Sequence, residues 1–110
     1  MIRCICINDK KKPNEIPTSH WVKLNEQYHI THIFKMVKFG NEIGVTLKEI
    51  DLLSLKDCPY EQFKLNRFAI HQDDLEKFLK LAQDCNDLND VDLYKLMKEV
   101  NELSFEPILK

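Results

Sequence analysis

Residues 27–47, QYHITHIFKMVKFGNEIGVTL, decide the fold because they hold two strand-like runs joined by a tight turn. The first run, residues 27–38, alternates between two faces and is rich in β-branched and aromatic residues. One of its faces carries Tyr28, Ile30, His32 and Phe34. The second run, residues 43–50, places Ile43, Val45 and Leu47 on one face. Glycine and asparagine tolerate positive φ at little cost, so the pair at 40–41 predicts a hairpin whose strands are antiparallel.

The segments on either side of the hairpin also predict strands. In residues 2–7, IRCICI, the face that suits burial carries Ile2, Cys4 and Cys6. Residues 67–70 supply a further short strand, and PYEQF at 59–63 predicts one turn of helix begun by proline. Because the chain has only two glycines, its strands must bend at bulges or at corners with polar residues. Residues 1–70 therefore predict a small antiparallel β-barrel.

From residue 72 the apolar period becomes that of a helix, with apolar residues at 75, 78, 79 and 82. Asp73 and Asp74 fall in its first turn, where the helix dipole favours acids, which explains them better than a catalytic acid and base. Asn89 can cap a second helix. The apolar stripe of that helix consists of Leu93, Leu96, Met97, Val100 and Leu103. Residues 71–110 therefore predict a helical hairpin, packed on the barrel or on a partner subunit.

The stripe of the second helix leaves two interpretations open. Packing within the chain is the more usual arrangement for such a stripe. The alternative is self-association, in which the same five residues form the seam of a homodimer. Replacing Leu96 and Val100 by aspartate distinguishes the two, because a seam would give a folded monomer and internal packing would give unfolding.

Length and composition bound the class of protein. A chain of 110 residues fits one compact unit, and no apolar run approaches the roughly 20 residues that span a bilayer. The first residues are too short and too polar for a secretory signal, so we expect a cytoplasmic protein without membrane contact. Residues 1–70 carry 11 basic against 8 acidic residues, and residues 71–110 carry 5 against 10. The first segment is therefore net +3 and the second net −5.

Five motifs in the first 70 residues resemble a group of small SH3-like barrel proteins from phages and gut-type bacteria. They are CIND at 6–9, IPTSHWVK at 16–23, QYHI at 27–30, LKEI at 47–50 and PYEQFKLNRFAI at 59–70. The resemblance implies a five-stranded barrel and a phage-encoded factor that binds a host or defence protein, and it implies no catalytic residue. The WxxxGxxY arrangement of that group has Asn25 in place of its glycine. Asparagine tolerates the left-handed backbone that this turn needs.

The segment before the hairpin would form the long first loop of such a barrel. Pro13 and Pro17 stiffen this loop by fixing φ, and Trp21 lies at its foot. An indole that closes a small core needs one acceptor for its N–H. Alternatively, the indole joins a groove that presents aromatic faces to a proline-rich peptide or to a base. The candidate partner-binding residues are Trp21, Tyr28, Tyr60, Phe63 and Arg67.

Two other functions give different expectations. A protein that sequesters a small molecule or nucleotide in a pocket at a subunit seam would bring cationic and polar side chains together there. The candidates are Arg3, Lys23, His32 and Arg67. A nucleic-acid-binding barrel would gather lysines on one face and lose affinity steeply with salt. Those lysines are Lys10, Lys11, Lys12, Lys23 and Lys35.

The sequence carries no enzyme signature, since it lacks a glycine-rich phosphate loop, a GxSxG elbow and an HExxH pair. Cys4 and Cys6 alternate onto one face, but a structural zinc site usually needs a second close pair, and Cys58 and Cys85 stand alone. In a cytosolic chain such thiols are reduced and pack as small hydrophobes. We therefore expect a non-enzymatic module that has neither metal nor cofactor and that binds a protein partner.

Overall fold

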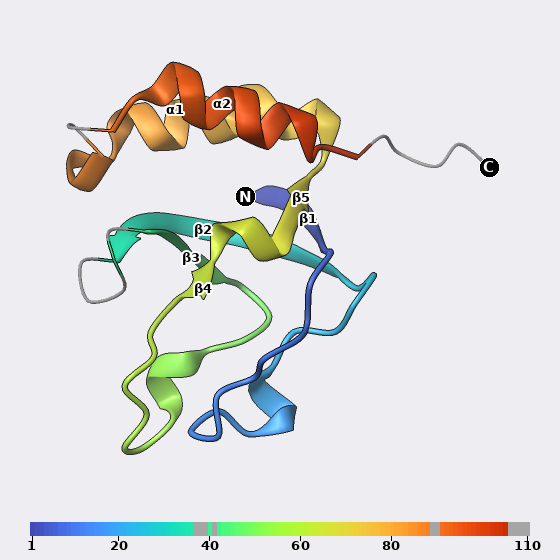
Figure 1. The fold of residues 1–110 in the computed structure, drawn as a ribbon, viewed down its shortest axis with the longest axis vertical. Coiled ribbons are helices and arrows are strands. Elements are labelled where there is room, and N and C mark those ends of the chain that lie inside the picture. The colour runs from blue at the N-terminus through green and yellow to red at the C-terminus, as the bar shows by residue number, and fades with distance from the viewer. Residues whose placement is uncertain (37–39, 41, 89–90, 106–110) are drawn as a thin grey trace.

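The structure is a computed structural model that describes residues 1–36, 40, 42–88 and 91–105, and its architecture is α+β (Figure 1). A five-stranded antiparallel sheet is followed by two helices, as the sequence predicts. The strands are β1 (Ile2–Cys6), β2 (Gln27–Met36), β3 (Glu42–Leu47), β4 (Phe63–Lys64) and β5 (Phe68–Ile70). Their order is β4-β3-β2-β1-β5. β4 and β5 are the two edges, and in the described part of the chain no hydrogen-bonded pairing joins them into a closed barrel.

The hairpin of β2 and β3 is antiparallel, as its turn residues predict. Its register pairs Ile33 with Val45 and Met36 with Glu42. Gly40 has a φ of 73°, which a glycine adopts at no steric cost. Asn41, the other residue of the predicted turn, lies outside the described residues. In the strand order of the sheet, β2 is the central strand and β3 lies beside it.

A β-bulge interrupts the alternation of β2. The register shifts between Ile30 and His32, which inserts one extra residue into this strand. Tyr28 and Ile30 are buried before the bulge, and Ile33 is buried directly after it, whereas His32 is exposed. The prediction that His32 and Phe34 share a face with Tyr28 and Ile30 is therefore wrong, because one inserted residue moves every later side chain to the opposite face.

The first strand follows its predicted pattern, whereas the segment before β5 does not. In β1 the buried residues are Ile2, Cys4 and Cys6. The one-turn helix predicted for residues 59–63 is wrong, because Phe63 instead begins β4 and pairs with Val45. The helical turn comes later, as the 3₁₀ turn η4 (Leu65–Arg67), so that Arg67, the first residue of the predicted strand, lies outside β5. Phe63 and Phe68 are buried on either side of this turn, and their burial fixes the positions of β4 and β5.

Two helices cover one side of the sheet, while the long loops of residues 7–26 and 48–62 project from the other (Figure 1). A 3₁₀ turn, η5 (Gln72–Asp74), leads into α1 (Leu75–Asp84), and α2 is Leu93–Glu102. The predicted cap, Asn89, lies outside the described residues. The cap observed is Asp92, whose carboxylate accepts from the Lys95 amide at 3.2 Å. Neither helix is long and apolar enough to cross a bilayer, and the described residues contain no other that is.

The stripe of α2 packs mainly inside the chain. Leu96 and Val100 are buried in the same core cluster as residues of the sheet, and Leu93 and Met97 pack against that cluster. Leu103 alone keeps a large exposed fraction, 44%. Internal packing, the more usual of the two interpretations, therefore accounts for four of the five residues that were candidates for a dimer seam.

Substitution of Leu96 by aspartate tests this packing. The variant buries a carboxylate that has no partner, so the free energy of unfolding is expected to fall by at least about 3 kcal/mol, measured by urea denaturation. Tyr94→Asp is the matched control, because Tyr94 is 83% exposed on the same helix and its replacement should change stability by less than about 0.5 kcal/mol. A folded Leu96→Asp monomer obtained from a dimeric parent would contradict this account and identify the stripe as a seam.

Candidate functional site

Trp21 heads a cluster of aromatic rings that runs from the first loop into the core. Its ring lies 5.7 Å from that of Phe63, and Phe63 meets Phe68 edge-on at 6.3 Å. Phe68 in turn meets Tyr28 at 6.3 Å. On the Trp21 ring lies the guanidinium of Arg67, 4.7 Å from the ring centroid. The structure therefore brings four of the five candidate partner-binding residues into one cluster.

Trp21 and Arg67 also fasten the first loop. The Trp21 Nε1–H donates to the carbonyl of Asp9 at 2.6 Å, which is the single acceptor that a buried indole needs. Arg67 donates to the carbonyls of Asn8 and Lys10 at 3.1 and 2.8 Å. Asn25 has a φ of 67°, the left-handed geometry expected of it, and its amide donates to the carbonyl of Cys6. The loop is therefore held at both ends.

Burial divides the candidate partner-binding residues into two groups. Tyr28 and Phe63 are buried, so their rings mainly fill the core. Trp21, Tyr60 and Arg67 are half-buried and keep part of their surface accessible. A binding role therefore stays a prediction for these three, and for Tyr28 and Phe63 the burial favours the role in the core.

The residues of the two alternative functions are partly committed to internal contacts. Arg67 stacks on Trp21, and Arg3 binds a buried carboxylate described below, so each guanidinium already has a partner within the chain. Lys12 donates to the carbonyls of Pro13 and Ile16, the latter at 2.6 Å. Lys10 and Lys11 are exposed at the tip of the same loop. Lys12 therefore stabilises the loop, and Lys10 and Lys11 expose their charges to solvent.

A groove lies beside the aromatic cluster, along β2 and β3 and under the loop of residues 48–62, and we call it the β2–β3 groove. It encloses about 510 Å³. Its walls include Thr31, His32, Phe34, Thr46, Leu52, Leu53 and Phe63. The two threonine hydroxyls are 2.7 Å apart, and His32 Nδ1 is 3.4 Å from that of Thr46. The groove thus combines an apolar floor with a small polar group at the bulge of β2.

The 3₁₀ turn η3 (Leu52–Ser54) presents an apolar side chain at this groove. Asp51 caps the turn, because its carboxylate accepts from the Leu53 amide at 3.0 Å. Leu52 points into the core and is buried, whereas Leu53 is 71% exposed. The groove was not predicted from the sequence. The leucine pair at 52–53 was a possible sign of an exposed apolar side chain, because a tight turn can bury only one of two adjacent side chains.

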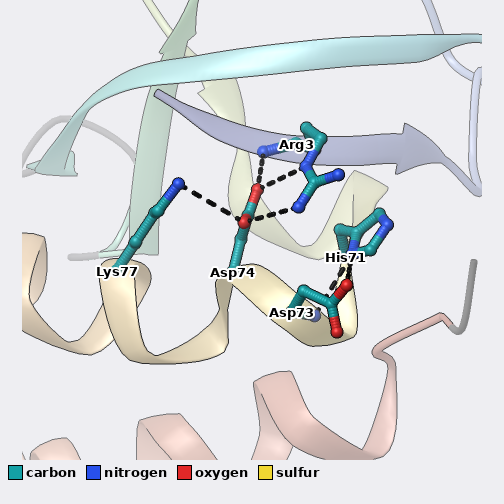
Figure 2. A network of polar contacts seen from close by, with 5 residues as sticks. All are labelled: Arg3, His71, Asp73, Asp74 and Lys77. Atoms are coloured by element: carbon teal, nitrogen blue, oxygen red, sulfur yellow. Dashed lines mark hydrogen bonds and ion pairs between the residues drawn. The ribbon is translucent and has the colours of Figure 1, made fainter.

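The second polar cluster joins the first strand to the start of α1 (Figure 2). The Asp74 side chain is only 1% exposed. It accepts from the backbone amide of Arg3 at 2.8 Å and from the guanidinium at 2.9 Å on each carboxylate oxygen. Lys77 Nζ lies 3.7 Å away. Hydrogen bonds from Arg3 hold the pKa of Asp74 well below its usual range. The carboxylate is therefore ionised, and it ties α1 to β1.

His71 completes this junction. Its Nδ1 accepts from the Asp73 amide at 3.1 Å, so the ring caps η5. The His71 ring also meets Phe105 edge-on at 5.1 Å, and the two residues form a parallel bridge. Asp73 and Asp74 do lie at a helix start, as predicted. The sequence offers no signal that Asp74 is bound by Arg3, 71 residues earlier.

The described residues bring no three metal-ligating side chains together. Burial raises the pKa of Cys4 to about 12, so this thiol is protonated at neutral pH and is a poor nucleophile. Comparison with family models, with curated proteins and with solved structures found no match.

Asp74→Asn tests the junction. It leaves the Arg3 amide and guanidinium facing a neutral side chain, so the free energy of unfolding at pH 7 is expected to fall by about 3 kcal/mol in urea denaturation. An aspartate whose pKa is lower in the folded than in the unfolded protein stabilises the fold at pH values above its unfolded pKa of about 3.9. That stabilisation is lost as the pH falls below this value towards the pKa of the folded state. The variant should therefore lose less stability than the parent between pH 5 and pH 2.

Asp73→Asn is the matched control, because Asp73 is the exposed neighbour on the same turn. Its stability should stay within about 1 kcal/mol of the parent. Equal losses in the two variants, or an unchanged acid profile in Asp74→Asn, would show that Asp74 does not hold the helices.

Proposed function

We propose that the chain is a non-enzymatic protein-interaction module whose sheet forms a small SH3-like barrel. Three features support the barrel: β5 lies beside β1, the 3₁₀ turn η4 carries the chain from β4 to β5, and Phe63 and Phe68 fill the space between these edges. The resemblance described above adds a phage-encoded factor in the host cytoplasm that binds a host or defence protein. The C-terminal helices complete the core of this module.

The observation that carries the proposal is the β2–β3 groove with Leu53 exposed at it. Protein interfaces typically have an apolar centre inside a polar rim. Here Phe34 and Leu52 line the centre, and Thr31 and Thr46 supply hydroxyls beside it. The partner best suited to this groove is a protein segment with an apolar side chain to cover Leu53 and polar backbone groups to meet the hydroxyls.

The charges of the groove favour a protein over a nucleic acid. Lys48 stands there with Asp51 and Glu61, so the lining has no excess of cations. Phosphate backbones need several unpaired cations on one face, because their release of counterions supplies most of the affinity. The proposed contact should therefore depend only mildly on salt.

Site-specific photo-crosslinking tests the proposal. A photoreactive phenylalanine analogue replaces Leu53 in cells of the organism that encodes the chain, and a parallel variant carries it at Leu24, which is 49% exposed on the first loop. We expect one protein adduct from position 53 and none of the same mass from position 24. With that protein purified, Leu53→Asp should weaken binding by about tenfold or more, and Leu24→Asp by less than about twofold.

Three outcomes would overturn the proposal. They are the absence of any adduct at position 53, identical adducts at both positions, and unchanged affinity in Leu53→Asp. An adduct with a second copy of the chain would instead support self-association through this surface.

A further inference from the structure

A second hollow lies between α2 and the segment that joins β4 to β5, and we call it the α2 cleft. It encloses about 260 Å³. Leu65 and Phe68 form one wall, and Leu96 and Val100 of α2 form the other. Figure 1 shows α2 running above this segment of the chain. The turn η4 carries the chain from β4 to β5 here, and α2 packs over the apolar side chains of this segment.

The mouth of the α2 cleft is apolar and acidic. Leu103, the residue after the helix, is 44% exposed there. Glu99 stands beside it, and among the described residues no cation pairs with its carboxylate. Glu42, on the sheet side of the mouth, forms an exposed ion pair with Lys64 at 3.3 Å. The mouth therefore joins an exposed leucine to an uncompensated negative charge.

The end of α2 increases this negative potential. The C-terminus of a helix carries a partial negative charge, which favours cations and disfavours acids in the last turn. The last turn of α2 has no basic residue, and it contains Glu99 and Glu102. The segment 71–110 as a whole is net −5. A positive group placed at the mouth would therefore be stabilised both by the carboxylates and by the helix dipole.

We propose that the α2 cleft binds a basic segment of a partner protein, which inserts one large apolar side chain and places lysine or arginine beside Glu99. Pockets for small molecules usually enclose about 300–1,000 Å³, so this smaller, open cleft suits the anchor side chain of a peptide better. Binding hot spots are commonly such anchors, surrounded by polar contacts. No residue that lines this cleft also lines the β2–β3 groove, so the inference goes beyond the function proposed above.

Peptide titration of the isotope-labelled full chain tests the inference by NMR. The first probe is a short synthetic peptide with one central phenylalanine flanked on both sides by lysines. Its controls replace the lysines by glutamates or the phenylalanine by serine. We expect the first peptide to shift the methyl signals of Ile43, Val100 and Leu103, and to bind at least about tenfold more tightly than either control.

Charge variants of the chain locate the contact. Glu99→Lys should weaken binding of the lysine-flanked peptide by about tenfold, and Glu76→Lys, the same change on an exposed position of α1, by less than about twofold. Leu103→Ser should weaken it as well, whereas Tyr94→Ser should not. All four positions are exposed, and the methyl spectrum of each variant shows whether it is folded.

Several results would overturn the inference. No shift at millimolar peptide, equal affinity for the acidic peptide, or shifts confined to other residues would each do so. A simple alkylamine that binds as tightly as the peptide would identify a small-molecule site instead. Shifts of the same methyl signals with protein concentration alone would show that a second copy occupies the cleft.

Discussion

The structure depends on one buried carboxylate. Asp74 sits where the sheet ends and the helices begin, and all three of its donors on Arg3 come from the first strand. A buried charge is tolerated only when hydrogen bonds replace those that it made with water. If one partner of the pair is removed, the other stays buried without a partner, and the free energy of unfolding falls. The hydrogen bonds between Arg3 and Asp74 therefore fix the position of α1 relative to β1. Burial of the apolar helix faces stabilises the same arrangement.

This junction separates the two sides of the sheet. The helices and the C-terminal bridge at Phe105 occupy one side of the sheet, and Cys85 of the helical layer contacts the carbonyl of Ile33 in β2. The long loops are on the other side, fastened by Trp21 and Arg67. Among the described residues, one hollow lies beside Leu53 and another beside Glu99. They differ in charge, so the two proposed contacts suit two partners or two segments of one partner.

The sequence predicted those features that depend on neighbours along the chain. Periodicity predicted the central hairpin, the buried cysteines of β1 and the apolar faces of both helices. The resemblance implied the left-handed turn at Asn25, because asparagine tolerates the geometry of the glycine that it replaces. The bulge near Thr31 and the short strand at Phe63 were missed, because each depends on which distant residue lies on the adjoining strand. The Asp92 cap is local, but Asn89 was chosen in its place because asparagine is an equally suitable cap residue. Of the candidate site, the need of the Trp21 N–H for an acceptor was foreseen, but not that the acceptor is the Asp9 carbonyl. The grooves were not, since they lie between segments far apart in sequence.

Native-state hydrogen exchange of the parent chain tests the central claim, that sheet and helices form one cooperative unit joined at Asp74. The account predicts that the Arg3 amide, which is bound to Asp74, and the protected amides of α1, α2 and β1 open with a single free energy equal to that of global unfolding. We also expect the opening free energies of all these amides to fall with denaturant concentration at one common slope. Opening of the helices at a clearly lower free energy, while β1 and the central hairpin stay protected, would contradict it.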